Sequence, residues 1–153
     1  MTLSDLLASI LGHFRKPKMS ISLKDYLTAS GKYPERENHP ELTPELKKNA
    51  ESFLKTLNAF LAEIGLTNVK VSSGFRPSAV NASTPGSAKK SLHMICLACD
   101  IEDSDGSKDN LVDSRDDLLK KHGLWQESPA ATKGWLHLDN KDRGKRPKNQ
   151  FIP

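Results

Sequence analysis

Asp100 stands in an otherwise apolar run, Met94 to Ile101, that is typical of a buried strand. A buried carboxylate is costly unless it is paired, hydrogen-bonded or bound to a metal ion. Two histidines are its candidate partners: His93 just before the run and His137 on a later predicted strand. Two neutral imidazoles and one carboxylate leave a fourth coordination position open, as in a catalytic zinc site. On spacing alone, a buried hydrogen bond between a histidine and Asp100 is the alternative that stays open.

Three segments around these residues resemble the motifs of one family and occur in its order. They are Ser73-Gly74-Phe75-Arg76, the segment from Ser91 to Asp100, and Trp135-Leu136-His137. They resemble the Ser-Gly-aromatic-Arg, Ser-x-His-x-x-Gly-x-Ala-x-Asp and Trp-x-His segments of the zinc peptidases of the M15 family. That group includes D-alanyl-D-alanine carboxypeptidases and phage endolysins, and shares its metal-binding fold with hedgehog-type domains. The resemblance runs from about Ile21 to Pro153 and is nearest to small phage-encoded peptidases of subfamily A of this family.

The resemblance implies a role for each matching residue. His93, Asp100 and His137 would be the zinc ligands. Arg76 would bind a carboxylate or carbonyl oxygen of the substrate, because its planar guanidinium suits bidentate recognition; a plain structural ion pair is the alternative. Ser91 would form a hydrogen bond that orients the site, or else a local backbone cap.

Two positions depart from the family pattern. Cys96 replaces the family's glycine, so the backbone there must accept a side chain. Gly134 stands three residues before the last histidine, where many members carry the acidic general base. Peptide hydrolysis needs a group that takes a proton from water and delivers it to the leaving amine. We expect this group to be Glu127, upstream of the histidine strand. Asp139, on the same strand face as His137, is the second candidate, and an inactive site or an unrecognised group is the remaining alternative.

One long helix is the clearest structural signal in the chain. It begins after Thr43, a good N-cap, with Pro44 in the first helical position, and it ends at Gly65. Its apolar residues recur on one face, at Leu46, Ala50, Phe53, Leu54, Leu57, Phe60, Leu61 and Ile64. This amphipathic pattern predicts a scaffold helix that packs on the core.

The remaining patterns predict short elements. We expect a strand over 69–73, a loop over 78–92, a strand over 94–101, a helix over 113–122 and a strand over 135–139. His93 and Asp100 are seven residues apart and would point to opposite faces of one regular strand, so His93 must precede the strand or lie beyond a bulge. This order predicts an α+β fold with a small, mostly antiparallel sheet flanked by helices. The resemblance implies that it is hedgehog/DD-peptidase-like.

Length and composition set the outer limits. The chain has 153 residues, of which 36% are hydrophobic and 27% charged, which suits one globular domain and excludes collagen, long coiled coils and wholesale disorder. We divide it into an N-terminal extension, residues 1–20, and a zinc peptidase-like domain, residues 21–153. The two cysteines, Cys96 and Cys99, are too few for a disulfide scaffold, and we expect ordinary buried thiols.

The net charge of +4 equals that of the segment 141–150 alone, which has five basic residues against one acidic. Such a segment is usually a solvated surface, but it can also meet phosphate, nucleic acid or an anionic wall polymer. We do not expect nucleic acid, because no aromatic residues are interleaved with the basic ones. No apolar stretch reaches about 18 residues and no cleavage site follows the first one, so we expect neither a membrane span nor a signal peptide.

The resemblance implies hydrolysis of an amide bond in the stem peptides of peptidoglycan. The enzyme would be a D-Ala-D-Ala carboxypeptidase or a wall endopeptidase of endolysin type, with zinc as its cofactor and peptidoglycan as its partner. It would be made in the cytoplasm and act on the wall after lysis-linked release, or as a component of a phage virion. The alternative is a non-catalytic, zinc-containing virion or wall-binding module, which Gly134 favours.

Overall fold

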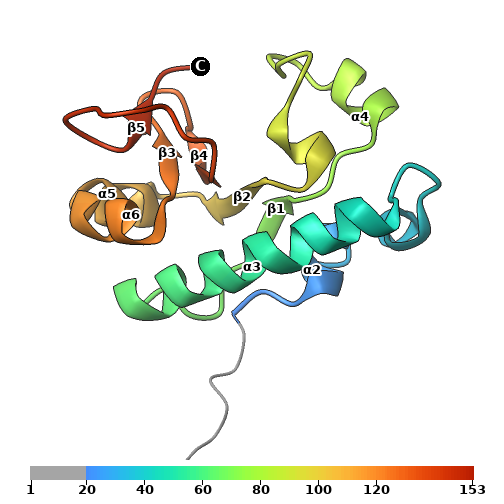
Figure 1. The fold of residues 1–153 in the computed structure, drawn as a ribbon, viewed down its shortest axis with the longest axis horizontal. Helices are drawn as coiled ribbons and strands as arrows, with labels where there is room; N and C mark the ends of the chain where they lie inside the picture. The colour runs from blue at the N-terminus through green and yellow to red at the C-terminus, as the bar shows by residue number, and fades with distance from the viewer. Residues whose placement is uncertain (1–19) are drawn as a thin grey trace, which may run out of the picture.

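A five-stranded sheet organises residues 20–153, which are the residues that the computed structural model describes (Figure 1). In the order β1-β2-β4-β3-β5, its strands are Val71–Ser73, Ala98–Asp103, Gly134–Asp139, Trp125–Glu127 and Gln150–Phe151. All neighbouring pairs are antiparallel except β3 and β5. The predicted α+β class with a mostly antiparallel sheet is confirmed. The predicted extension, residues 1–20, lies outside the described residues except for Ser20.

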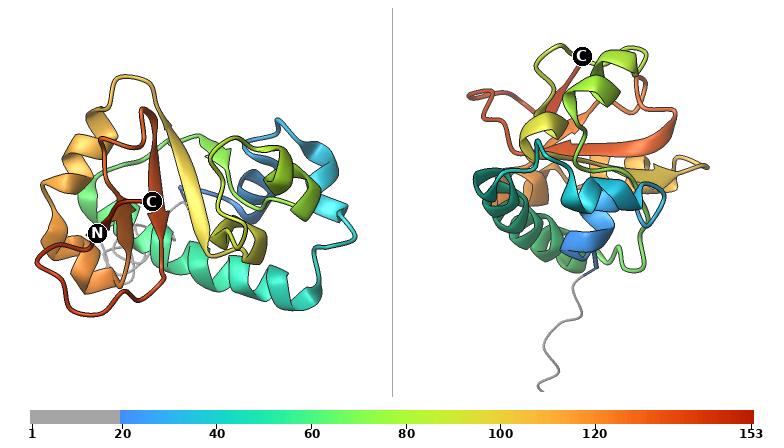
Figure 2. Two further views of the ribbon diagram at one scale, coloured as in Figure 1. Left: turned by 90° about the horizontal axis from the view of Figure 1, so that it is seen from above. Right: turned by 90° about the vertical axis from the view of Figure 1, so that its right-hand side faces the viewer.

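Five α-helices and two 3₁₀-helices surround this sheet in the described part of the chain. They are α2 (Leu23–Thr28), η1 (Pro34–Asn38), α3 (Pro44–Ile64), α4 (Ser78–Ser83), η2 (Leu92–Ile95), α5 (Ser107–Asp113) and α6 (Asp116–His122). The long helix α3 runs below the sheet, and α4 lies above it (Figures 1 and 2). Among residues 20–153, none of these helices has the length and apolar character needed to cross a membrane.

The predicted scaffold helix is present as α3. The Thr43 hydroxyl accepts a hydrogen bond from the Leu46 amide and so caps the first turn. Gly65 ends the helix in the left-handed conformation, with φ of 80°. The buried face of α3 forms much of the core together with residues of β2 and β4, through Ala50, Phe53, Leu54, Leu57, Phe60, Leu61 and Ile64.

The two faces of the sheet carry different kinds of residue, because successive side chains along a strand point to opposite faces. Ile101 on β2 and Leu136 and Leu138 on β4 belong to the apolar core with α3. Asp100 and His137, one residue away from them in sequence, therefore point to the opposite face. On that face β2 is flanked by the segment with β5 on one side and by the segment with α4 on the other (Figure 2).

Several expected boundaries are wrong. The strand predicted over 69–73 starts only at Val71. The strand predicted over 94–101 starts only at Ala98, and the residues before it form η2. The Ser91 hydroxyl caps η2 by accepting from the His93 amide, and Cys96 ends it with φ of 60°. The predicted loop over 78–92 begins with the short helix α4, which no apolar repeat marks because Asn81 is its only buried residue.

The helix predicted over 113–122 is present as α6 but begins only at Asp116, and a separate helix, α5, precedes it. The helix α5 ends at Asp113 and α6 begins at Asp116, because Arg115 adopts a non-helical conformation with φ of −122° and ψ of 48°. The carboxylate of the buried Asp103 accepts hydrogen bonds from the amides of Lys108 and Asp109 and thereby fixes the start of α5. The short strands β3 and β5 were not expected from periodicity, since two or three residues carry too little of it.

Candidate metal centre

Three side chains from η2, β2 and β4 meet on the sheet face that points away from α3. His93 Nε2 lies 3.3 Å from Asp100 Oδ2, and His137 Nδ1 lies 2.6 Å from Asp100 Oδ1. One ligand atom of each residue lies within 4.8 Å of the other two, so the cluster could hold a metal ion. Asp100 and His137 are register partners in the β2–β4 pair, and this cross-strand pairing brings them together.

The 3₁₀-helix η2 aims His93 at this cluster. Its Nδ1 lies 2.8 Å from the carbonyl oxygen of Gly74, which can only accept, so Nδ1 donates there and Nε2 is the nitrogen that faces the cluster. Gly74 approaches the Tyr26 backbone so closely that a Cβ there would lie 2.0 Å from the Tyr26 carbonyl oxygen. The glycine of the first motif is therefore required by packing.

Cys96, which stands where the family pattern has a glycine, is accommodated without a change of backbone conformation. Its φ of 60° and ψ of 37° lie in the left-handed region, which glycine enters most easily. This chain places a cysteine in the same conformation and buries its side chain in the core. Cys99 is also buried, and burial raises the pKa of both thiols, to about 12 for Cys96. Both cysteines are the ordinary buried thiols that the sequence predicts.

His137 presents its other nitrogen to the cluster. Its Nε2 lies 3.2 Å from Asp139 Oδ2, which leaves Nδ1 facing Asp100. Burial lowers the pKa of His137, but the hydrogen bonds and charges of Asp100 and Asp139 outweigh it and raise that pKa to about 10. Burial likewise opposes ionisation of Asp100, yet the charges and hydrogen bonds of His93 and His137 hold its pKa below the usual range. The carboxylates thus stabilise positive charge at this place, as a cation site requires.

Arg76 lies at the edge of the same cluster. Its Nη2 is 3.6 Å from Asp100 Oδ2 and donates to Ser73 Oγ at 3.1 Å, while Nη1 donates to Asn81 Oδ1 at 3.2 Å. Arg76 is only 8% exposed, and Asn81 in turn donates to the Ala88 carbonyl. The guanidinium is thus held in place beside the cluster, and Asn81 is a contributor that no sequence motif indicated. The Ser91 hydroxyl lies in the local backbone cap of η2.

The two candidate proton-transfer groups differ in their surroundings. Glu127 lies on β3, and its Oε2 is 3.9 Å from His137 Nδ1. Burial raises the pKa of Glu127, the charge of His137 opposes this, and the charges of Asp100 and Asp139 add to it. Asp139 is only 1% exposed, and Arg143 donates to both of its oxygens, at 2.7 and 2.9 Å. Glu127 is therefore better placed for proton transfer than Asp139.

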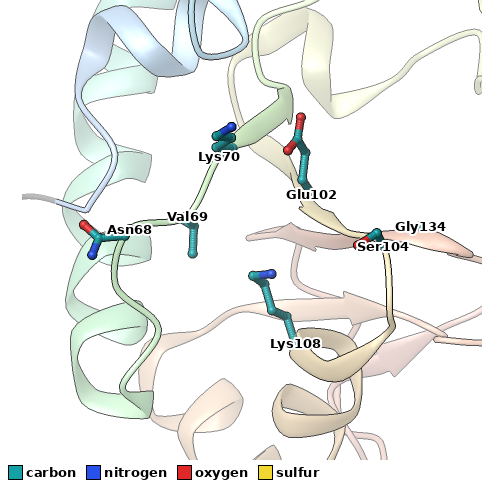
Figure 3. A pocket seen from close by; sticks show the side chains of 7 residues that line it. All are labelled: Asn68, Val69, Lys70, Glu102, Ser104, Lys108 and Gly134. Atoms are coloured by element: carbon teal, nitrogen blue, oxygen red, sulfur yellow. The ribbon is translucent and has the colours of Figure 1, made fainter.

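Gly134 lies away from the cluster. Three residues along a regular strand correspond to about 10 Å and to the opposite face, so a side chain at 134 would not point with His137. Gly134 instead lines a surface hollow without any residue of the cluster (Figure 3), together with Asn68, Val69, Lys70, Glu102, Ser104 and Lys108. Its φ of 104° would also strain any other residue.

The comparisons with known proteins agree with this geometry. A family model described as Peptidase M15 matches residues 33–139, a span that includes the three clustered residues, Arg76 and Glu127. No curated protein and no solved structure matches the chain. Because the matched span covers well over half of its length, the chain belongs to the peptidase M15 family.

Proposed function

We propose that the protein is a zinc-dependent peptidase that hydrolyses an amide bond in peptidoglycan stem peptides. The observation that carries this proposal is that three kinds of side-chain group lie close together on one sheet face. The cluster of His93, Asp100 and His137 could hold a metal ion, Arg76 provides a fixed guanidinium, and Glu127 provides a carboxylate next to His137. Membership of a peptidase family supports hydrolysis, and the motif resemblance to wall peptidases supports the substrate.

The donor set favours zinc among the divalent metals. Two imidazole nitrogens and one carboxylate oxygen suit zinc, whereas magnesium and calcium prefer oxygen ligands alone. Both histidines bind an acceptor through their second nitrogen, Gly74 O and Asp139 Oδ2, as metal-binding histidines usually do. Zinc held by three such ligands supplies Lewis-acid chemistry and lowers the pKa of water to about 7.

The surrounding residues divide the remaining work. Glu127 takes a proton from the attacking water and delivers it to the leaving amine, and its raised pKa brings it closer to neutral pH, where such a group is most effective. Arg76 donates to a carboxylate or carbonyl oxygen of the substrate. Because Ser73 and Asn81 already hold the guanidinium, its orientation is set before the substrate binds.

The basic segment after β4 offers a second contact with the wall. Lys141, Lys145 and Arg146 are exposed there, whereas Arg143 bonds to Asp139 and Lys148 to Asp113. The exposed charges would hold an anionic wall polymer, and this contribution should weaken with salt. In this proposal the protein reaches the wall after lysis-linked release or as part of a phage virion.

Mass spectrometry of soluble fragments from purified peptidoglycan tests the proposal. The protein is assayed as isolated, after chelation and after zinc is restored. Metal-dependent release of defined stem peptides or of free D-alanine is expected, and the fragment masses identify the bond. Absence of release from several wall types by protein that contains zinc would refute the peptidase and favour a non-catalytic wall-binding or virion module.

A further inference from the structure

Arg143, in the basic segment, contacts both carboxylate oxygens of Asp139, which lies next to the cluster. Its Nη1 donates to Asp139 Oδ1 at 2.7 Å and its Nη2 to Asp139 Oδ2 at 2.9 Å. Asp139 Oδ2 lies 3.2 Å from His137 Nε2. A continuous chain of charged hydrogen bonds thus joins the basic segment to a candidate metal ligand.

Two aromatic rings hold the guanidinium in this orientation. The guanidinium carbon of Arg143 lies 3.6 Å from the centre of the Phe151 ring and 5.5 Å from that of Trp125. The Phe151 ring also lies edge-on to the imidazole of His137, with ring centres 5.8 Å apart. Since Phe151 is on β5 and Trp125 on β3, the pairing of these strands places both rings where Arg143 needs them.

Asp139 needs a counter-charge. It is 1% exposed, and its negative charge also disfavours the charged form of nearby Glu127, whose pKa it helps to raise. Besides Arg143, the carboxylate has, among residues 20–153, only the Lys141 amide, which donates to Oδ1 at 3.0 Å, and the His137 imidazole beside Oδ2. Without the guanidinium, its orientation would be held less firmly, and His137 Nε2 would face a less fixed acceptor.

We propose that Arg143 is a positioning residue of the metal centre: its bidentate bond orients Asp139, which selects the form of His137 that binds metal through Nδ1. The inference rests on the zinc site of the proposed function but not on its substrate. Arg143 and Phe151 both lie after residue 139, where the match to the peptidase M15 model ends. The sequence signal for this role was the spacing of Arg143 four residues after Asp139, inside a segment that otherwise looks like solvated surface.

Zinc affinity is the first measurement. The dissociation constant is determined by competition with a chromophoric chelator for the unchanged protein, Arg143→Gln, Arg143→Lys and the control Arg146→Gln. Arg146 lies in the same segment near the Trp125 ring, 5.9 Å from its centre. We expect Arg143→Gln to weaken zinc binding by about 10- to 100-fold. Arg143→Lys should weaken it less, since an ammonium keeps the charge but loses the two-pronged contact. Arg146→Gln should not change it.

The second measurement separates positioning from mere structural support. In zinc-loaded, ¹⁵N-labelled protein, the proton on His137 Nε2 is identified by its coupling to the ring nitrogens. Its hydrogen bond to a charged carboxylate places it far downfield, and we expect both Arg143 variants to move this signal upfield or broaden it by exchange. A residue that only stabilised the fold would leave the signal unchanged while the protein stays folded.

Unchanged zinc affinity in a folded Arg143 variant would overturn the inference, as would weaker affinity with an unchanged His137 signal. If Arg143→Gln does not fold, the same two readouts on Arg143→Lys decide. Neither readout uses peptidoglycan. A protein that binds zinc through this network yet releases no wall fragments would therefore refute the proposed function and leave this inference standing.

Discussion

Replacement of Glu127 by glutamine should separate turnover from zinc binding and from folding. Glutamine has nearly the same shape but does not accept a proton, so the change removes proton transfer and little else. The carboxylate lies 3.9 Å from His137 Nδ1, the atom that would bind the metal, and so lies next to the proposed reaction site. Within residues 20–153 no hydrogen bond ties Glu127 side-chain atoms to the fold. The substitution Glu127→Gln should therefore change the free energy of unfolding by no more than about 0.5 kcal/mol.

The effect on turnover should be far larger. A positioned acid or base contributes about 10²- to 10⁴-fold to the rate, which corresponds to about 2.7 to 5.4 kcal/mol of transition-state stabilisation. We expect kcat for release of stem-peptide fragments to fall by this factor in Glu127→Gln. Zinc content should stay stoichiometric, since the three ligands and their hydrogen-bond partners are untouched.

A matched control is available on the same sheet face. Glu102 lies two residues after Asp100 on β2, is exposed, and lines the hollow that contains Gly134. Glu102→Gln makes the same change of charge without touching the cluster, and its kcat should match that of the unchanged protein. If Glu127→Gln, with full zinc content, stays within about tenfold of the unchanged protein, its loss falls short of that expected for an acid or base, and the proton-transfer group lies elsewhere.

Three further outcomes follow from the geometry. Gly134→Glu should not restore turnover to Glu127→Gln, because position 134 is on the other face of β4; recovery in the same fragment assay would show that the strand geometry misleads. Gly74→Ala should lower the free energy of unfolding in urea by more than about 3 kcal/mol, since its Cβ would meet the Tyr26 carbonyl at 2.0 Å; a small loss would show that the backbones separate easily. In chelated protein, the raised pKa of His137 stabilises the fold fully below about pH 6.5, the unfolded value, and this contribution disappears as the pH rises to about 10. Urea unfolding at pH 7 and pH 9.5 should show the decline, with a flatter profile for His137→Gln; equal slopes would contradict it.

The three clustered residues could be named from the sequence because a chemical argument and the motif resemblance both point to them. A carboxylate in an apolar run needs a partner whether the run is a strand or not, and two histidines were within reach. The helix α3 was equally accessible, since its cap, its apolar face and its terminal glycine are all local signals. The odd spacing to Asp100 required His93 to precede the strand or to lie beyond a bulge, and the structure has it before the strand.

The errors arose where a local pattern fits two structures. The run from Met94 to Ile101 has the composition of a buried strand. None of its own residues indicates that Cys96 adopts the left-handed backbone conformation. The break between α5 and α6 depends on the conformation of one residue, Arg115. The helix α4 has no apolar face to detect, because polar contacts of Asn81 hold it. Each of these features is determined by contacts with distant residues.

Strand register explains why the position of the proposed proton-transfer residue, Glu127, could not be predicted from spacing along one strand. In the antiparallel pair of β3 and β4, Trp125 pairs with Asp139 and Gln126 with Leu138. The next step of this register sets Glu127 across from His137, and its carboxylate arrives 3.9 Å from the imidazole. A residue three positions before His137 on β4 is about 10 Å away and on the other face. Gly134 is therefore no argument for an inactive site in this chain. The decision between an enzyme and a binding module depends on Glu127.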